Sequence, residues 1–78
     1  MSVAMRWNKY EVSNWVSNLS RQRNLGDIGL IFENLNVDGL RLYEYHDYWK
    51  LRDIGIPTVG FRIILGKEIE ELIKDSHQ

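Results

Sequence analysis

The stretch WNKYEVSNWVSNL, residues 7–19, decides the fold because it combines a helix start signal with helical periodicity. Asn8 and Glu11 have the spacing of a capping box, in which each side chain bonds the backbone of the other residue. The apolar residues that recur at helical spacing after the cap are Val12, Trp15, Val16 and Leu19. The polar residues between them are Ser13, Asn14, Ser17 and Asn18. The sequence therefore predicts a helix over 9–19, with the serines and asparagines opposite its apolar stripe.

The next segment predicts a loop and a second helix. Residues 20–26 are polar, lack helical spacing and end in a glycine. Asp27 stands where an N-cap is needed, although Gly29 weakens the start of the helix that follows. The apolar residues expected on its buried face are Ile28, Ile31, Phe32 and Leu35.

Turn residues divide the middle of the chain into two short helices. The Asp-Gly pair at 38–39 is a strong turn signal, and a short helix fits over 40–45. Asp47 is expected to cap a second short helix over 48–54. Gly55 is placed to end that helix in a left-handed conformation.

A long helix is predicted after the only proline, Pro57, with Thr58 as its cap and Ile73 near its end. Gly66 in its interior costs about 1 kcal/mol relative to alanine. The residues expected on its inner face are Leu65, Ile69, Leu72 and Ile73. Five helices with short connections predict a compact all-α bundle with a long C-terminal helix.

Length and composition exclude several classes of protein. Seventy-eight residues allow one small domain, which we place at 7–74 with flexible ends at 1–6 and 75–78. The absence of cysteine excludes disulfides and cysteine-based zinc sites and favours an intracellular compartment. No apolar run approaches the roughly 20 residues of a membrane span, and the N-terminus does not resemble a secretory signal. The net charge of −1 argues against a generic nucleic-acid binder.

The charge is uneven along the chain. Residues 1–26 hold four basic side chains against one acid, whereas residues 27–53 hold six acids against three bases. The sequence therefore predicts an acidic surface in the middle of the chain.

Nothing in the sequence favours catalysis. His46 and His77 lack the spacing of paired metal ligands, and the serines lack a partner base. We expect no enzymatic activity, no metal, no cofactor and no small-molecule substrate.

Motifs over residues 7–73 occur in an order that resembles the SAM (sterile alpha motif) domain family. These motifs are Trp7, Val12, Trp15-Val16, Phe32, Val37-Asp38-Gly39, Leu51, Ile54-Gly55-Ile56, Gly60-Phe61-Arg62, Ile69 and Leu72. The chain departs from the family pattern by one extra residue near 44–47, and Phe61 stands where the family usually has histidine. The resemblance implies a compact five-helix SAM-like bundle.

The resemblance also implies two protein-binding surfaces. The mid-loop surface, often acidic in the family, corresponds here to Asp38, Glu44, Asp47 and Asp53. The end-helix surface, often basic in the family, corresponds here to Val59, Gly60, Arg62, Ile63, Ile64 and Lys67. The residues themselves offer another role for two of the acids, because Asp47 is placed to cap a helix and Asp38 to form a turn.

The start of the last helix is unusually apolar. If Leu65 faces the core, then Ile63 and Ile64 lie 100–200° away around the helix. Both cannot easily be buried, so we expect at least one to be exposed, and we expect Phe61 to lie in the core. A small apolar patch framed by Arg62 and Lys67 would bind a partner protein.

The aromatic residues at 43–49 allow two interpretations. They could form a stacking platform for nucleic acid, but the local charge is acidic. We favour the interpretation in which Tyr43, Tyr45 and Trp49 help fill the core while Tyr48 is exposed.

The function expected from the resemblance is self-association, or association with another SAM domain, within a larger intracellular signalling or scaffold protein. We expect a cytoplasmic location, with a nuclear one also open, and no membrane contact. Two alternatives remain. One is an RNA-hairpin-binding module, which the apolar residues at the start of the last helix disfavour. The other is a monomeric structural helical domain.

Overall fold

The capping box at Asn8 starts the first long helix of the bundle. The Asn8 side chain accepts hydrogen bonds from the Tyr10 and Glu11 backbone N–H groups, and the Asn8 N–H donates to the Glu11 side chain. The computed structural model describes residues 3–75, and within that range the chain contains five α-helices, two 3₁₀ helices and no strand. These elements are η1 (Val3–Arg6), α1 (Lys9–Arg21), α2 (Gly29–Asn34), α3 (Gly39–Leu42), η2 (Tyr43–His46), α4 (Tyr48–Asp53) and α5 (Val59–Asp75).

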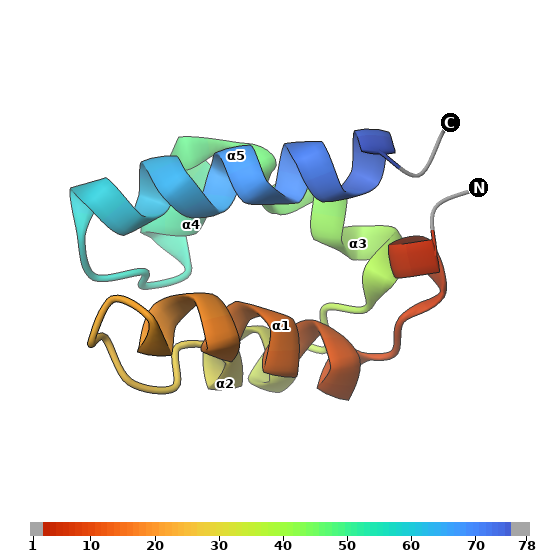
Figure 1. Cartoon of the computed structure of the whole chain (residues 1–78), viewed down its shortest axis with the longest axis horizontal. Helices are drawn as coiled ribbons and strands as arrows, with labels where there is room; N and C mark the ends of the chain where they lie inside the picture. Colours follow the sequence, from red (N-terminus) through yellow and green to blue (C-terminus); the bar gives the residue numbers. More distant parts are fainter. Residues whose placement is uncertain (1–2, 76–78) are drawn as a thin grey trace.

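The helices form two layers around one core. Figure 1 shows α1 and α2 in one layer and α4 and α5 in the other, with η1 and α3 beside the two chain ends. The fully buried apolar side chains come from every α-helix, from the connection before α3 and from the connection after α4. They include Val12, Val16, Phe32, Val37, Leu42, Leu51, Ile56, Phe61, Leu65 and Ile69. The predicted all-α bundle with a long C-terminal helix is thus confirmed.

The predicted helix starts and stops are largely confirmed. Asp47 caps α4, because its side chain accepts from the Trp49 N–H at 2.8 Å. The Thr58 hydroxyl accepts from the Phe61 N–H at 3.1 Å at the start of α5. Gly55 follows α4 with φ = +98°, the left-handed conformation that glycine adopts without strain. The predicted helix over 40–45 is divided into α3 and η2.

The prediction that Asp27 caps the second helix is wrong. The helix begins at Gly29 after Ile28, which makes no side-chain capping bond. The Asp27 carboxylate instead accepts from the Arg21 Nε at 2.6 Å. Arg21 is the last residue of α1, and its ion pair with Asp27 takes the place of the expected cap. Leu35, expected on the buried face, is exposed.

Ser13 and Ser17 were expected opposite the apolar stripe of α1 together with Asn14 and Asn18, but only the two asparagines are exposed. Ser13 and Ser17 are buried against Gly29 of α2, and Ser20 is buried against the connection that precedes α2. A Cβ at Gly29 would overlap with the Ser13 carbonyl oxygen, so only glycine fits at this contact. The Gly29 N–H donates to the Ser17 hydroxyl at 3.0 Å, which compensates for the burial of both groups. Small side chains on α1 and a missing one on α2 thus set the spacing of the two helices.

Part of the N-terminal segment expected to be flexible is helical. Residues 3–6 form η1, whose Ala4 is buried, while residues 1–2 and 76–78 lie outside the described range. Across residues 3–75, no helix is both long enough and apolar enough to span a membrane.

Candidate protein-binding site

The first turns of α5 carry two exposed apolar side chains. Val59 and Ile63 are one helical turn apart, and more than half of each residue's surface is exposed. Phe61, between them in sequence, faces the core and is buried. Ile64 is half-buried, so the expectation that at least one of the two isoleucines is exposed is confirmed. The exposed pair therefore forms an apolar edge at the start of α5.

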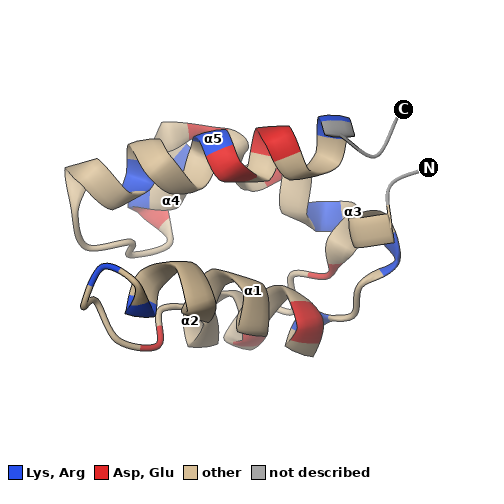
Figure 2. Cartoon of the chain, viewed as in Figure 1, with Lys and Arg blue, Asp and Glu red and all other residues tan. Residues whose placement is uncertain are grey.

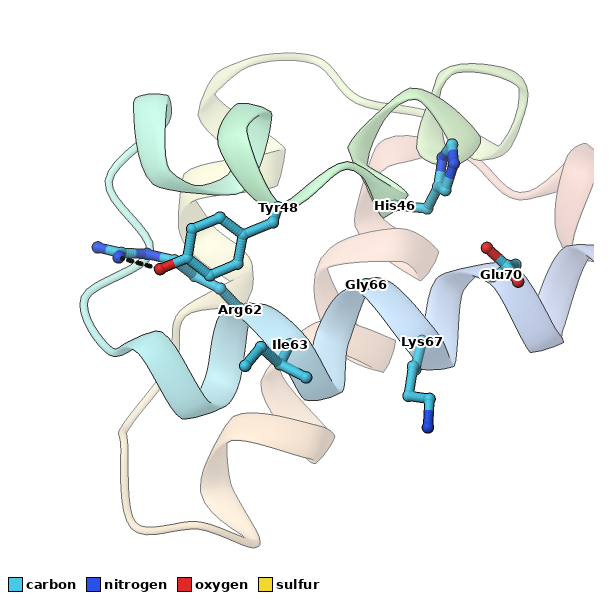
Figure 3. Close-up of a pocket in the computed structure, with 7 residues that line it drawn as sticks. All are labelled: His46, Tyr48, Arg62, Ile63, Gly66, Lys67 and Glu70. Atoms are coloured by element: carbon cyan, nitrogen blue, oxygen red, sulfur yellow. Dashed lines mark hydrogen bonds between the residues drawn. The ribbon is translucent and has the colours of Figure 1, made fainter.

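A groove of about 240 Å³ runs along α5 beside this edge. We call it the α5 groove, and its lining residues are His46, Tyr48, Arg62, Ile63, Gly66, Lys67 and Glu70. Figure 3 shows Tyr48 and Arg62 at one end of the groove and His46 and Glu70 at the other. Arg62, Ile63 and Lys67 were predicted as end-helix residues, and the groove brings all three together.

Arg62 is held in place by three contacts. Its Nε donates to the Ile56 carbonyl oxygen at 2.7 Å, and its Nη1 donates to the Tyr48 hydroxyl at 3.3 Å. The guanidinium carbon also lies 5.6 Å from the centroid of the Tyr48 ring, within the range of a cation–π interaction. Arg62 thus joins α5 to the start of α4 and presents a charge in a fixed position.

Gly66 allows η2 to approach the middle of α5. It is buried, and a Cβ at this position would lie 2.7 Å from the His46 carbonyl oxygen. Gly66 therefore lies at the base of the contact between α5 and η2, and it also lines the α5 groove together with Ile63. The cost of an interior glycine is therefore offset by close packing of these two elements.

Charged groups line the far end of the groove. The Lys74 Nζ donates to a Glu70 carboxylate oxygen at 3.0 Å. This hydrogen bond and the positive charge of Lys74 lower the pKa of Glu70, and the same pairing raises the pKa of Lys74. Lys67 is exposed, and Figure 3 shows its side chain directed away from η2. The site therefore offers one fixed cation, Arg62, and one solvated cation, Lys67, on either side of Ile63.

The predicted acidic surface is divided in space. Asp27 and Glu33 belong to the α2 side, where Asp27 is paired with Arg21. The four predicted mid-loop acids lie at 38–53, where Arg41, Lys50 and Arg52 are interspersed among them. Figure 2 shows acidic and basic segments alternating over α3 and α4. The acidic residues that give 27–53 its excess negative charge therefore do not form one continuous surface.

The four acids also differ in what they contact. Asp38 and Asp47 act as N-caps, since their carboxylates accept from the backbone N–H groups of Arg41 and Trp49 respectively. Glu44 and Asp53 are exposed, and neither makes an ion pair within residues 3–75. Glu44 and Asp53 are therefore the two acids available to a partner.

The aromatic residues were partly assigned to the wrong environment. Tyr45 packs edge-on against buried Phe32, with ring centroids 5.5 Å apart, as expected for a core residue. Trp49 is 62% exposed and Tyr43 is also exposed, whereas Tyr48 is half-buried. Because α4 is short and turns Leu51 inward, the indole of Trp49 is left outside, where Arg52 lies 5.7 Å from its ring centroid. Sequence reasoning missed His46, Tyr48 and Glu70 as groove residues, and no sequence signal marked them.

Comparison with known protein families, with characterised proteins and with solved structures finds no significant match. In the described part of the chain, no cluster of three or more histidine, cysteine, aspartate or glutamate side chains could hold a metal ion.

Proposed function

We propose that this chain is a SAM-like protein-interaction module that associates with a second copy of itself or with another SAM-like domain. The observation that carries the proposal is the apolar edge of Val59 and Ile63, which is exposed beside the α5 groove and framed by Arg62 and Lys67. An exposed apolar patch bordered by polar groups is typical of a protein-binding surface. We place the partner contact on this edge and groove.

The fixed geometry of Arg62 supports this assignment. A side chain already held by two hydrogen bonds loses little conformational freedom when a partner binds. Arginine and tyrosine are also among the residues that carry most binding energy at interfaces. The groove therefore combines apolar contact with a positioned charge.

Glu44 and Asp53 supply the complementary charge on a second copy. Both are exposed on the short helices, and neither caps a helix as Asp38 and Asp47 do. Contact between opposite charges steers association and fixes orientation more than it adds affinity. Because the two surfaces differ, the resulting contact is heterologous and extends to chains of subunits unless it closes.

Sedimentation equilibrium tests the proposal with the variants Ile63→Lys and Asp53→Lys. Each substitution should leave the protein monomeric, because one removes the apolar edge and the other reverses a complementary charge. An equimolar mixture should form a 1:1 dimer, since each variant retains one intact surface. Leu30→Lys, at an exposed position on α2, is the matched control and should associate like the wild type.

The salt dependence gives a second criterion. Association should weaken as salt is raised, because exposed charges are screened. A wild type that stays monomeric at millimolar concentration contradicts self-association, and an Ile63→Lys variant that associates normally contradicts the assigned surface. Circular dichroism checks that each variant is folded.

A further inference from the structure

A second cavity lies at the end of the bundle where η1 packs against α5. It has a volume of about 530 Å³, and its lining residues are Met5, Leu40, Tyr43, Ile73 and Lys74. They come from η1, α3, η2 and α5, and Figure 1 shows η1, α3 and the last turn of α5 on the same side of the bundle. We call this cavity the terminal pocket. None of its lining residues lines the α5 groove.

The walls of the terminal pocket are held by close backbone packing. A Cβ at Gly39 would overlap with the Ala4 carbonyl oxygen, so the absence of a side chain lets η1 lie against α3. The Gly39 N–H donates to the Trp7 carbonyl oxygen at 2.8 Å, which fixes the segment after η1. Ala4 is only 2% exposed. These contacts fix η1 against α3, the two elements that carry the lining residues Met5 and Leu40.

The lining is apolar and leaves large side chains exposed. Leu40 is 65% exposed and Tyr43 is 39% exposed, while Ile73 is buried at the base. Ligand pockets in proteins commonly have volumes of about 300–1,000 Å³, with mainly apolar walls and a few polar groups that set orientation. Here the polar groups of the lining are the Tyr43 hydroxyl and the Lys74 ammonium.

One basic residue lines the pocket, and two more stand next to lining residues in the sequence. Lys74 is part of the lining, and Arg6 and Arg41 directly follow the lining residues Met5 and Leu40 in sequence. Figure 2 shows basic segments at η1, at α3 and at the end of α5.

The nearby acids differ in what they contact. Glu70 is paired with Lys74, and Asp38 accepts from a backbone N–H. Glu44 follows Tyr43 on η2 and has no ion pair among residues 3–75. Lys74 in an otherwise apolar lining, with Arg6 and Arg41 next to lining residues in the sequence, thus favours an anionic group on the ligand.

We propose that the terminal pocket binds a single-chain anionic amphiphile, such as a medium-chain carboxylate. Its hydrocarbon chain contacts Leu40, Tyr43 and Ile73, and its carboxylate faces Lys74. A half-open cavity lined by five residues fits one such chain, whereas a partner helix would need a longer apolar strip. This inference does not depend on the function proposed above, because it uses different residues.

The probe is decanoate, titrated below its micelle concentration into the full 78-residue chain and followed by two-dimensional NMR. Decyltrimethylammonium, which has the same chain and the opposite charge, is the matched control ligand. Saturable shifts should appear for decanoate at Leu40, Tyr43 and Ile73, with at least tenfold weaker binding of the cationic control. Using the Ile63→Lys variant keeps the measurement independent of self-association.

Two variants test the location. Leu40→Asp should weaken decanoate binding at least tenfold, whereas Leu30→Asp, at a similarly exposed position on α2, should change it less than twofold. Absence of saturable shifts, equal binding of the two ligands, or shifts confined to the α5 groove would overturn the proposal. So would an unchanged affinity in a folded Leu40→Asp variant. Binding of an acidic helical peptide in place of decanoate would assign the pocket to a protein partner and also overturn it.

Discussion

The Gly29 N–H and the Ser17 hydroxyl form a buried hydrogen bond of 3.0 Å that joins α2 to α1. It stands between two helices that touch through small side chains, and Ser17 is only 4% exposed. Without the hydroxyl, the Gly29 N–H would have no partner in a place that water does not easily reach.

The first prediction follows from this bond. Ser17→Ala should lower the free energy of unfolding by about 1–3 kcal/mol, the cost of leaving a buried donor unpaired. Urea denaturation measures the change. Asn18→Ala, on the exposed part of the same helix, should stay within about 0.5 kcal/mol of wild type. Equal losses in the two variants would show that the bond contributes nothing specific.

Gly66 and Gly60 form a matched pair on α5. Alanine is favoured over glycine within a helix by up to about 1 kcal/mol, and at Gly60 an added Cβ meets nothing within 4 Å. Gly60→Ala should therefore be neutral or stabilising. Gly66→Ala should destabilise by about 1–3 kcal/mol, because its Cβ crowds the His46 carbonyl oxygen and overpacking outweighs helix propensity. Thermal unfolding by circular dichroism distinguishes the two, and a stabilised Gly66→Ala would contradict the close contact with η2.

Alanine variants of Asp47 and Asp53 distinguish the stability contributed by a helix cap from that contributed by an exposed negative charge. Asp47→Ala should cost about 1 kcal/mol, since it removes the acceptor for the Trp49 N–H at the start of α4. Asp53→Ala removes the same charge from an exposed position and should change stability by less than about 0.5 kcal/mol. Chemical denaturation of both variants gives the comparison. If both lose the same stability, the cap is not the cause.

The Glu70–Lys74 pair predicts a direction of pH dependence. The pKa of Glu70 is lowered in the folded state, so its contribution is present above the unfolded pKa and is lost as the pH falls through the folded pKa. Lys74→Met should raise the pKa of Glu70 toward its ordinary value, and ¹³C NMR titration of the carboxyl carbon measures this. Because both side chains are solvated, the difference should shrink at high salt. An unchanged pKa would mean that the pair does not persist in solution.

Much of the fold could be predicted because its helices carry local signals. The caps at Asn8, Asp47 and Thr58 and the glycine at 55 depend only on nearby residues, and all four are confirmed. The serine face of α1 was predicted wrongly because helical periodicity sorts residues by polarity, whereas the contact with α2 selects them by size. A serine whose hydroxyl group forms a hydrogen bond within the protein can be buried as readily as exposed.

The site was only partly predictable for a related reason. Ile63 could be placed outside the core from its angle on the helix, which is a local property. The exposure of Trp49 depends on how the short α4 is oriented against α5, and that is set by contacts between distant residues. The burial of Gly66 under η2 depends likewise on a tertiary contact. A count of charges along 27–53 missed that these residues belong to opposite layers of the bundle.

The ion pair between Lys74 and Glu70 has a consequence for both the terminal pocket and the α5 groove. Lys74 lines the terminal pocket and Glu70 lines the α5 groove, so one contact is shared by two sites. A ligand anion that competes for Lys74 would leave the Glu70 charge uncompensated in the groove and make that groove less receptive to an acidic partner. By thermodynamic linkage, the partner would weaken ligand binding by the same factor. A single exposed ion pair would then make the two sites antagonistic.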